Sequence, residues 1–71
     1  MKTWWLEFVI GKKGWPFSGT FVEALREAQA NCTTDCTQVD VWDAENLQAA
    51  RVGFRGVEWV HRRWEDQRYG S

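Results

Sequence analysis

The 71-residue sequence has little proline, histidine and cysteine, with one, one and two residues respectively, and it has no long apolar run. Six glycines without a repeat or a low-complexity segment exclude a collagen-like chain and a long flexible linker. No segment approaches the roughly 18 apolar residues of a membrane-spanning helix. The N-terminus carries one Lys before a short run that Glu7 interrupts, which is not the pattern of a signal peptide. We therefore expect a protein of the reducing cytoplasm, or of the host cytoplasm if a phage encodes it.

The few cysteines and the single histidine also bear on cofactors. A zinc site needs about four ligands, and His61 cannot complete one with Cys32 and Cys36. A disulfide between the two cysteines would close a very short loop and add little stability, so two unbridged thiols are favoured and a local disulfide is the alternative. We expect no metal and no cofactor.

The sequence contains no convincing catalytic set either. Asp40 and Asp43 are more simply solvated charges than a carboxylate pair with separated pKa values. Cys36 and His61 are the residue types of a thiol nucleophile and its base, but their spacing carries no information, and so short a chain builds pockets poorly. We therefore expect no catalytic residues and no enzyme activity.

The sequence is instead rich in tryptophan, with six residues beside four Phe and one Tyr. A chain of this length forms one domain at most, and we expect a single compact domain over residues 1–71. Each enclosed aromatic side chain buries on the order of 150–250 Å², whereas a domain of this size hides only about 60% of its extended-chain surface. Two or three indoles fit such a core, so the others must lie partly in water or against a partner.

The N-terminal half predicts one strand and one helix. Residues 3–10 alternate as a strand that places Trp5 on one face and, on the core face, Trp4, Leu6, Phe8 and Ile10. Residues 11–20 have the composition of a loop. Thr20 and Glu23 form a capping-box pattern, which indicates the start of a helix. The apolar stripe of this helix consists of Phe21, Leu25, Ala28 and Cys32.

The C-terminal half predicts further strands. Residues 37–43 alternate with Trp42 on the outer face, and residues 47–54 follow as a second strand; the inward positions are Val39, Val41, Ala50, Val52 and Phe54. Residues 57–63 alternate as a strand, which we favour, but they also carry a helical stripe. The predicted fold class is α+β: a small antiparallel sheet in β-α-β-β-β order, with one helix packed on one face and the other face bare.

Charge is uneven along the chain, although the net charge is only −1. Residues 1–19 and 47–71 each carry +2, and residues 20–46 carry −5. A nucleic-acid-binding domain usually has a clear basic excess, so the balance argues against that class. The C-terminal third nevertheless interleaves arginines with aromatic residues, as platforms for single strands do. A single-stranded nucleic-acid-binding domain is therefore the alternative function.

Protein interfaces are rich in Trp and Arg and poor in Lys, and here Arg outnumbers Lys six to three. We therefore expect a small non-enzymatic protein-binding module. It would be an adaptor, or an inhibitor of the phage or mobile-element type that occludes a surface of a larger host complex. A homodimer is the other arrangement to consider, nucleic acid is the less favoured partner, and no membrane is expected. The expected partner-binding residues are Trp5, Trp15, Trp42, Arg51, Arg55, Arg62, Arg63 and Trp64.

Overall fold

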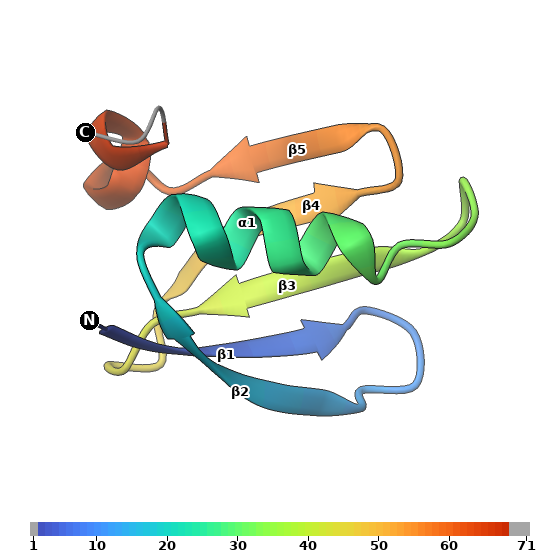
Figure 1. The fold of residues 1–71 in the computed structure, drawn as a ribbon, viewed down its shortest axis with the longest axis horizontal. Coiled ribbons are helices and arrows are strands. Elements are labelled where there is room, and N and C mark those ends of the chain that lie inside the picture. Colours follow the sequence, from blue (N-terminus) through green and yellow to red (C-terminus); the bar gives the residue numbers. More distant parts are fainter. Residues whose placement is uncertain (1, 69–71) are drawn as a thin grey trace.

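The computed structural model describes residues 2–68, which form a five-stranded sheet with one helix packed across it (Figure 1). The elements are β1 (Lys2–Phe8), β2 (Gly14–Gly19), α1 (Phe21–Ala30), β3 (Gln38–Trp42), β4 (Gln48–Gly53), β5 (Gly56–Val60) and a 3₁₀ helix, η1 (Arg62–Gln67). The strand order across the sheet is β2-β1-β3-β4-β5, and every neighbouring pair is antiparallel. The predicted α+β class is therefore confirmed. In the described chain no helix is both long and apolar enough to cross a membrane.

The segment predicted as a loop contains an additional strand. β2 forms a hairpin with β1 and lies at the edge of the sheet. An edge strand tolerates Pro16, which has no backbone NH to donate to a further neighbour. The order is therefore β-β-α-β-β-β. β1 also ends earlier than predicted, and Ile10 lies in the turn with 79% of its surface exposed rather than in the core.

Helix α1 begins where the sequence predicts. Thr20 Oγ1 accepts a hydrogen bond from Glu23 N at 3.1 Å, and Glu23 Oε1 accepts one from Thr20 N at 2.8 Å. This capping box satisfies two backbone NH groups at the start of the helix. The predicted apolar stripe is buried throughout, at Phe21, Leu25, Ala28 and Cys32.

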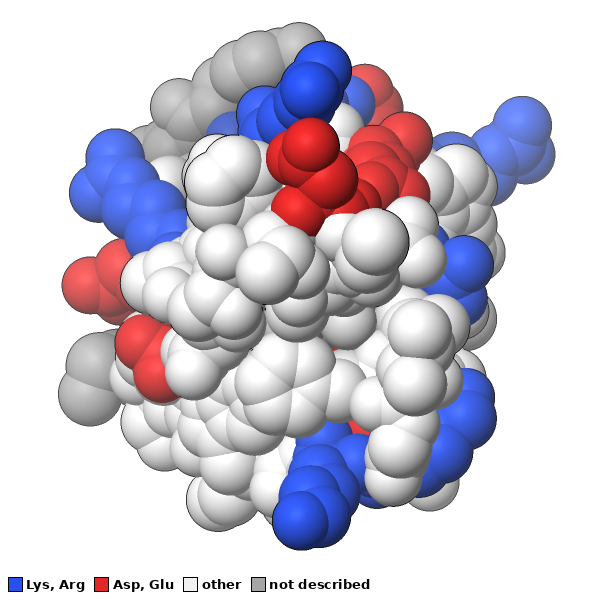
Figure 2. All heavy atoms as spheres, turned by 90° about the vertical axis from the view of Figure 1, so that its right-hand side faces the viewer, with Lys and Arg blue, Asp and Glu red and all other residues white. Residues whose placement is uncertain are grey.

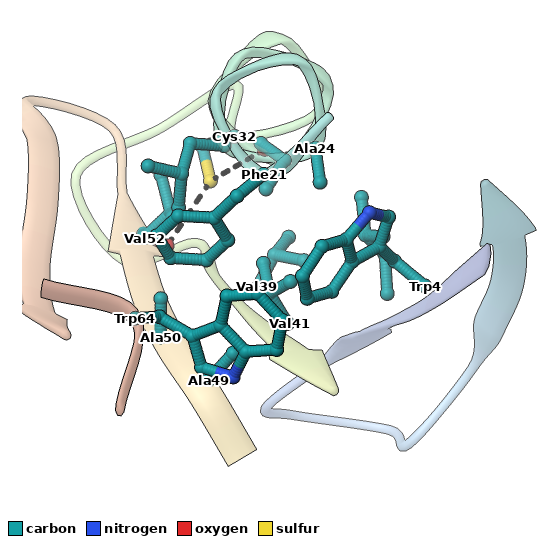
Figure 3. Packing of buried hydrophobic residues seen from close by; sticks show 13 residues of the cluster. Trp4, Phe21, Ala24, Cys32, Val39, Val41, Ala49, Ala50, Val52 and Trp64 are labelled. Atoms are coloured by element: carbon teal, nitrogen blue, oxygen red, sulfur yellow. Dashed lines mark hydrogen bonds between the residues drawn. The ribbon is translucent and has the colours of Figure 1, made fainter. Parts of the chain in front are cut away.

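The core lies between α1 and one face of the sheet (Figure 3). Leu6 lies opposite Val41, and Val41 lies opposite Ala50, so side chains of β1, β3 and β4 meet in one row. All three are fully buried. Removal of such apolar surface from water stabilises the fold by roughly 25 cal/mol per Å². The prediction that Phe54 points into this core is wrong. β4 ends one residue before Phe54, and Phe54 is 47% exposed.

Both cysteines are free thiols, as predicted, and only Cys36 is exposed. Cys32 Sγ lies 3.3 Å from Ala28 O and 3.6 Å from Val52 O, between the helix and the sheet (Figure 3). Burial raises the pKa of the Cys32 thiol, and the negative charge of Glu58 raises it further. The folded protein therefore favours the neutral thiol, which can donate to one of these carbonyls.

The C-terminal end of the described chain closes the core. The predicted strand is present up to Val60, after which η1 turns Trp64 inward, where it is 7% exposed. The Trp64 ring lies 4.8 Å from that of Trp4 and 5.6 Å from that of Phe21. The expectation that Trp64 is an exposed anchor is therefore wrong. Its Nε1 donates to Asp43 Oδ2 at 3.3 Å, so the one polar atom of the indole is satisfied inside the fold.

Candidate functional site

The face of the sheet opposite α1 is not covered by a helix in the described part of the chain (Figure 1). We call it the open face. Strand register and alternation with the core residues assign to it the following positions: Trp5, Glu7, Gly14, Pro16, Gln38, Asp40, Trp42, Gln48, Arg51, Glu58 and Trp59. All five strands contribute, so the open face is a continuous surface on a hydrogen-bonded scaffold.

Three of the six indoles belong to the open face. Trp5 of β1 lies opposite Trp42 of β3, and Trp59 of β5 lies opposite Arg51 of β4. Trp5 and Trp59 are 43% and 47% exposed. The structure thus brings together the predicted residues Trp5, Trp42 and Arg51, and it adds Trp59, which was not among the predicted binding residues. Gln48, Arg51 and Trp59 line a shallow pocket of about 210 Å³.

The Trp5 ring leans over the edge strand, where Gly14 leaves room for it. A Cβ atom at Gly14 would lie 2.7 Å from Cε2 and Cζ2 of Trp5, closer than real Cβ contacts allow. The neighbouring Trp42 is half-buried, and within residues 2–68 its buried Nε1 has no hydrogen-bond acceptor. An unpaired buried donor costs about 1–3 kcal/mol. The open face therefore carries a polar group that is not satisfied by the described chain.

An ion pair lies at the centre of the open face. Arg51 Nε donates to Asp40 Oδ1 at 2.7 Å, and Gln48 Nε2 donates to the same oxygen at 2.8 Å. The Asp40 side chain is only 4% exposed, so it is not the solvated charge that the sequence suggested. The hydrogen bond to Asp40 is the main reason that the pKa of the Arg51 guanidinium is raised above its ordinary value. Arg51 is thus occupied by an internal partner.

Two further carboxylates flank this pair. Glu58 Oε1 accepts a hydrogen bond from Gln38 Nε2 at 2.6 Å, and the Glu58 carboxylate occupies the space that a Cβ of Gly53 would fill. Glu7 lies opposite Asp40 in the β1–β3 register and is half-buried. Among residues 2–68 its carboxylate has no hydrogen-bond or ion-pair partner. Three carboxylates against one guanidinium give the open face a formal charge of −2.

Two of the predicted anchors lie elsewhere. Trp15 lies opposite Leu6 on the helix side of the sheet, where its ring is 5.3 Å from that of Phe8. It is half-buried and packs against the core rather than standing on the open face. Trp64 is inside the core.

The predicted arginines do not gather into one patch. Arg55 lies in the β4–β5 turn, 3.5 Å from Asp35. Arg62 and Arg63 belong to η1 at the opposite end of the sheet (Figure 1). Arg63 Nη1 donates to Glu45 Oε1 at 2.8 Å. Of the four arginines, only Arg51 lies on the same face as Trp5 and Trp42.

A second concave area lies at the end of the molecule formed by the β1–β2 turn and residues 31–37. It is an open hollow of about 600 Å³, and its lining includes Phe8, Ile10, Cys36 and Thr37. Figure 2 shows this end, with charged groups around the margin and uncharged residues across the middle. None of the described residues that line the hollow is charged, so they offer no strong group to orient a polar ligand.

The described residues contain no group of three or more His, Cys, Asp or Glu side chains placed to hold a metal ion. No protein-family model, curated protein or solved structure matches this chain.

Proposed function

We propose that this protein is a small protein-binding module that docks a partner on its open face, with Trp5, Trp42 and Trp59 as anchors. The observation that carries the proposal is the exposure of nearly half of the Trp5 and Trp59 surfaces on one sheet face. Indoles dominate interface hot spots because each buries a large apolar area with few rotatable bonds. Trp42 lies opposite Trp5 on the same face and is half-buried.

The scaffold beneath these indoles supports the proposal. β1, β3 and β4 each have a paired strand on both sides, so the positions of Trp5 and Trp42 are fixed by the sheet. Gly14 and the Asp40–Arg51 pair further define the space around the rings. A surface that is ordered before binding loses less conformational entropy when the partner docks.

Charge favours a protein over single-stranded nucleic acid as the partner. A platform for single strands combines stacking aromatics with basic side chains that contact phosphates. The open face has a formal charge of −2, and its only arginine is paired with Asp40. The other predicted arginines lie at the two ends of the sheet, and Trp64 is buried. As far as residue 68, the Arg-rich C-terminal third therefore supplies no basic groove beside the exposed indoles.

A module of this kind acts by occupying a surface. The role we propose is that of an adaptor, or of an inhibitor of the phage or mobile-element type that occludes part of a larger host complex. The reducing cytoplasm is the compartment that two free thiols suit.

Affinity capture from the lysate of a candidate host tests the docking surface. We expect the double variant Trp5→Ala/Trp59→Ala to lose proteins that the parent chain retains, with bound proteins quantified by mass spectrometry. The matched control is Phe54→Ala, because Phe54 is as exposed as Trp59 but lies in the β4–β5 turn. Equal retention by the parent and the double variant, with both folded by circular dichroism, would exclude the open face as the docking surface.

A further inference from the structure

Resting on the docking surface proposed above, we infer that the partner segment bound by the open face is cationic. It presents an Arg or Lys side chain next to apolar residues, with the charged group at Glu7 and the side-chain stem against Trp5. The juxtaposition that carries this inference is a half-buried carboxylate without a partner, placed beside an exposed indole on the same strand and face.

Of the three carboxylates on the open face, Glu7 is the one whose negative charge has no partner among residues 2–68. It lies directly opposite Asp40, and like charges at opposed positions of an antiparallel pair repel each other. Asp40 is neutralised by Arg51 and receives a hydrogen bond from Gln48. Nothing within residues 2–68 does the same for Glu7. A cationic side chain of a partner would form an ion pair with Glu7 and offset its repulsion from Asp40.

The exposed Trp5 ring provides a contact surface for the rest of a basic side chain that pairs with Glu7. Residues two apart on a strand point to the same face, roughly 6.5 Å apart along it. An Arg or Lys that pairs with Glu7 can therefore lay its methylenes or its guanidinium on the Trp5 ring, which is a cation–π arrangement. Glu58 places a second negative charge on β5, on the other side of the Asp40–Arg51 pair. A segment with basic residues spaced across the sheet would meet both carboxylates.

A second copy of this chain fits the open face less well. Two copies packed face to face would bring together two surfaces of charge −2. The charge therefore favours a segment of another protein.

Addition of a partner strand at an edge of the sheet is also disfavoured. The edge strand β2 contains Pro16, which cannot donate a backbone hydrogen bond. The other edge, β5, has only five residues and pairs with β4 through an irregularity between Arg51 and Val52. Short or irregular edges resist further pairing. Both sheet edges are therefore less suited to a partner than the open face.

Three synthetic peptides test the inference. Each peptide has about eight residues and alternates Leu with one type of polar residue, which is Arg, Gln or Glu. Fluorescence anisotropy of a label at one terminus gives the Kd of each peptide. We expect the Arg peptide to bind about tenfold more tightly than the Glu peptide, from one ion pair and one cation–π contact. The affinity should decrease from the Arg peptide to the Gln peptide and then to the Glu peptide.

Charge reversal at Glu7 supplies the decisive comparison. Glu7→Lys should weaken binding of the Arg peptide by about tenfold and make the Glu peptide the tighter ligand. Glu65→Lys is the matched control, because it changes the net charge equally but lies in η1, and it should leave the order unchanged. No binding of the Arg peptide, or an unchanged order in Glu7→Lys, would overturn the inference.

The inference and the proposed function fail in different ways. If capture of a protein depends on Trp5 and Trp59 while the peptides show no preference for Arg, the docking surface stands and the cationic partner is wrong. If Trp5→Ala/Trp59→Ala changes neither capture nor peptide binding, both are wrong. A dimer in sedimentation equilibrium that Trp5→Ala abolishes would show that the open face binds a second copy instead, and tight binding of poly(dT) would assign it to nucleic acid.

Discussion

Trp4 and Trp64 contact each other edge to face in the core, with ring centroids 4.8 Å apart, although they lie near opposite ends of the chain. Each indole NH has a fixed acceptor: Trp4 Nε1 donates to Gly19 O at 3.0 Å, and Trp64 Nε1 donates to Asp43 Oδ2 at 3.3 Å. Asp43 in turn accepts backbone NH groups of Glu45 and Leu47 at 2.9 and 3.0 Å. The ring pair thus joins the first strand, the β3–β4 turn and η1.

The Trp64 contact makes a prediction about stability. Trp64→Ala should lower the free energy of unfolding by about 3–5 kcal/mol, because it empties the space between Trp4 and Phe21. Trp64→Phe should cost less, since it retains a ring but loses the hydrogen bond to Asp43. Trp59→Ala is the control and should change stability by under about 1 kcal/mol, because that ring is 47% exposed. Urea unfolding followed by circular dichroism measures all three. Equal losses of stability for Trp64→Ala and Trp59→Ala would contradict the structural role of Trp64.

The ion pair at the centre of the open face makes a second prediction. Arg51→Gln should destabilise the protein by about 1–3 kcal/mol, because the Asp40 carboxylate stays buried without its cation. Asp40→Asn should recover much of that loss in the double variant, so the two effects should be non-additive. Arg55→Gln serves as the control, because the Arg55–Asp35 pair is largely exposed and contributes little. Additive effects of Asp40→Asn and Arg51→Gln in urea unfolding would show that the pair does not couple.

The buried thiol makes a prediction about pH. The pKa of Cys32 is raised in the folded state, chiefly by burial, so above the ordinary thiol pKa of about 8.5 the unfolded chain loses a proton that the folded chain keeps. Stability is therefore fully retained below about pH 8 and falls as pH rises toward the raised pKa, by at most about 1.4 kcal/mol per pH unit. Urea unfolding between about pH 7 and 10 measures this slope. Cys32→Ala should reduce the slope more than the control Cys36→Ala, because only Cys32 is buried. Identical slopes in both variants would show that Cys32 is not the source of the pH dependence.

The sequence predicted the parts of the fold that depend on local pattern. The capping box and the apolar stripe of α1 are as expected, since helix caps and periodicity are short-range signals. Alternation in β1 and β3 correctly placed Trp5 and Trp42 on the outer face of the sheet. The strand β2 was missed because Gly14, Pro16 and Gly19 are turn-forming residues, and only pairing with β1 makes an edge strand of them.

The missed features of the site depend on long-range register. Trp59 faces outward because the register of β5 shifts at Glu58, so that Val57 and Val60 share the core face and simple alternation fails. Asp40 meets Arg51, and Glu7 meets Asp40, only through strand pairing that no local pattern reveals. Trp64 is buried because η1 folds back onto the core, a tertiary contact that overrides its polar sequence neighbours. Two of the three open-face indoles, Trp5 and Trp42, were among the predicted binding residues, whereas Trp15 lies on the helix side of the sheet and Trp64 lies in the core.

Trp4 and Trp5 are neighbours in β1, yet the first contributes to folding and the second to the proposed recognition surface. A slip of β1 by one position against its neighbouring strands would exchange their roles: it would expose the indole that now meets Trp64 and bury the one that now stands beside Glu7. Exchange of the side chains at positions 5 and 7 can therefore alter the proposed recognition surface while positions 4 and 6 keep the core, provided that the register of the strand is preserved.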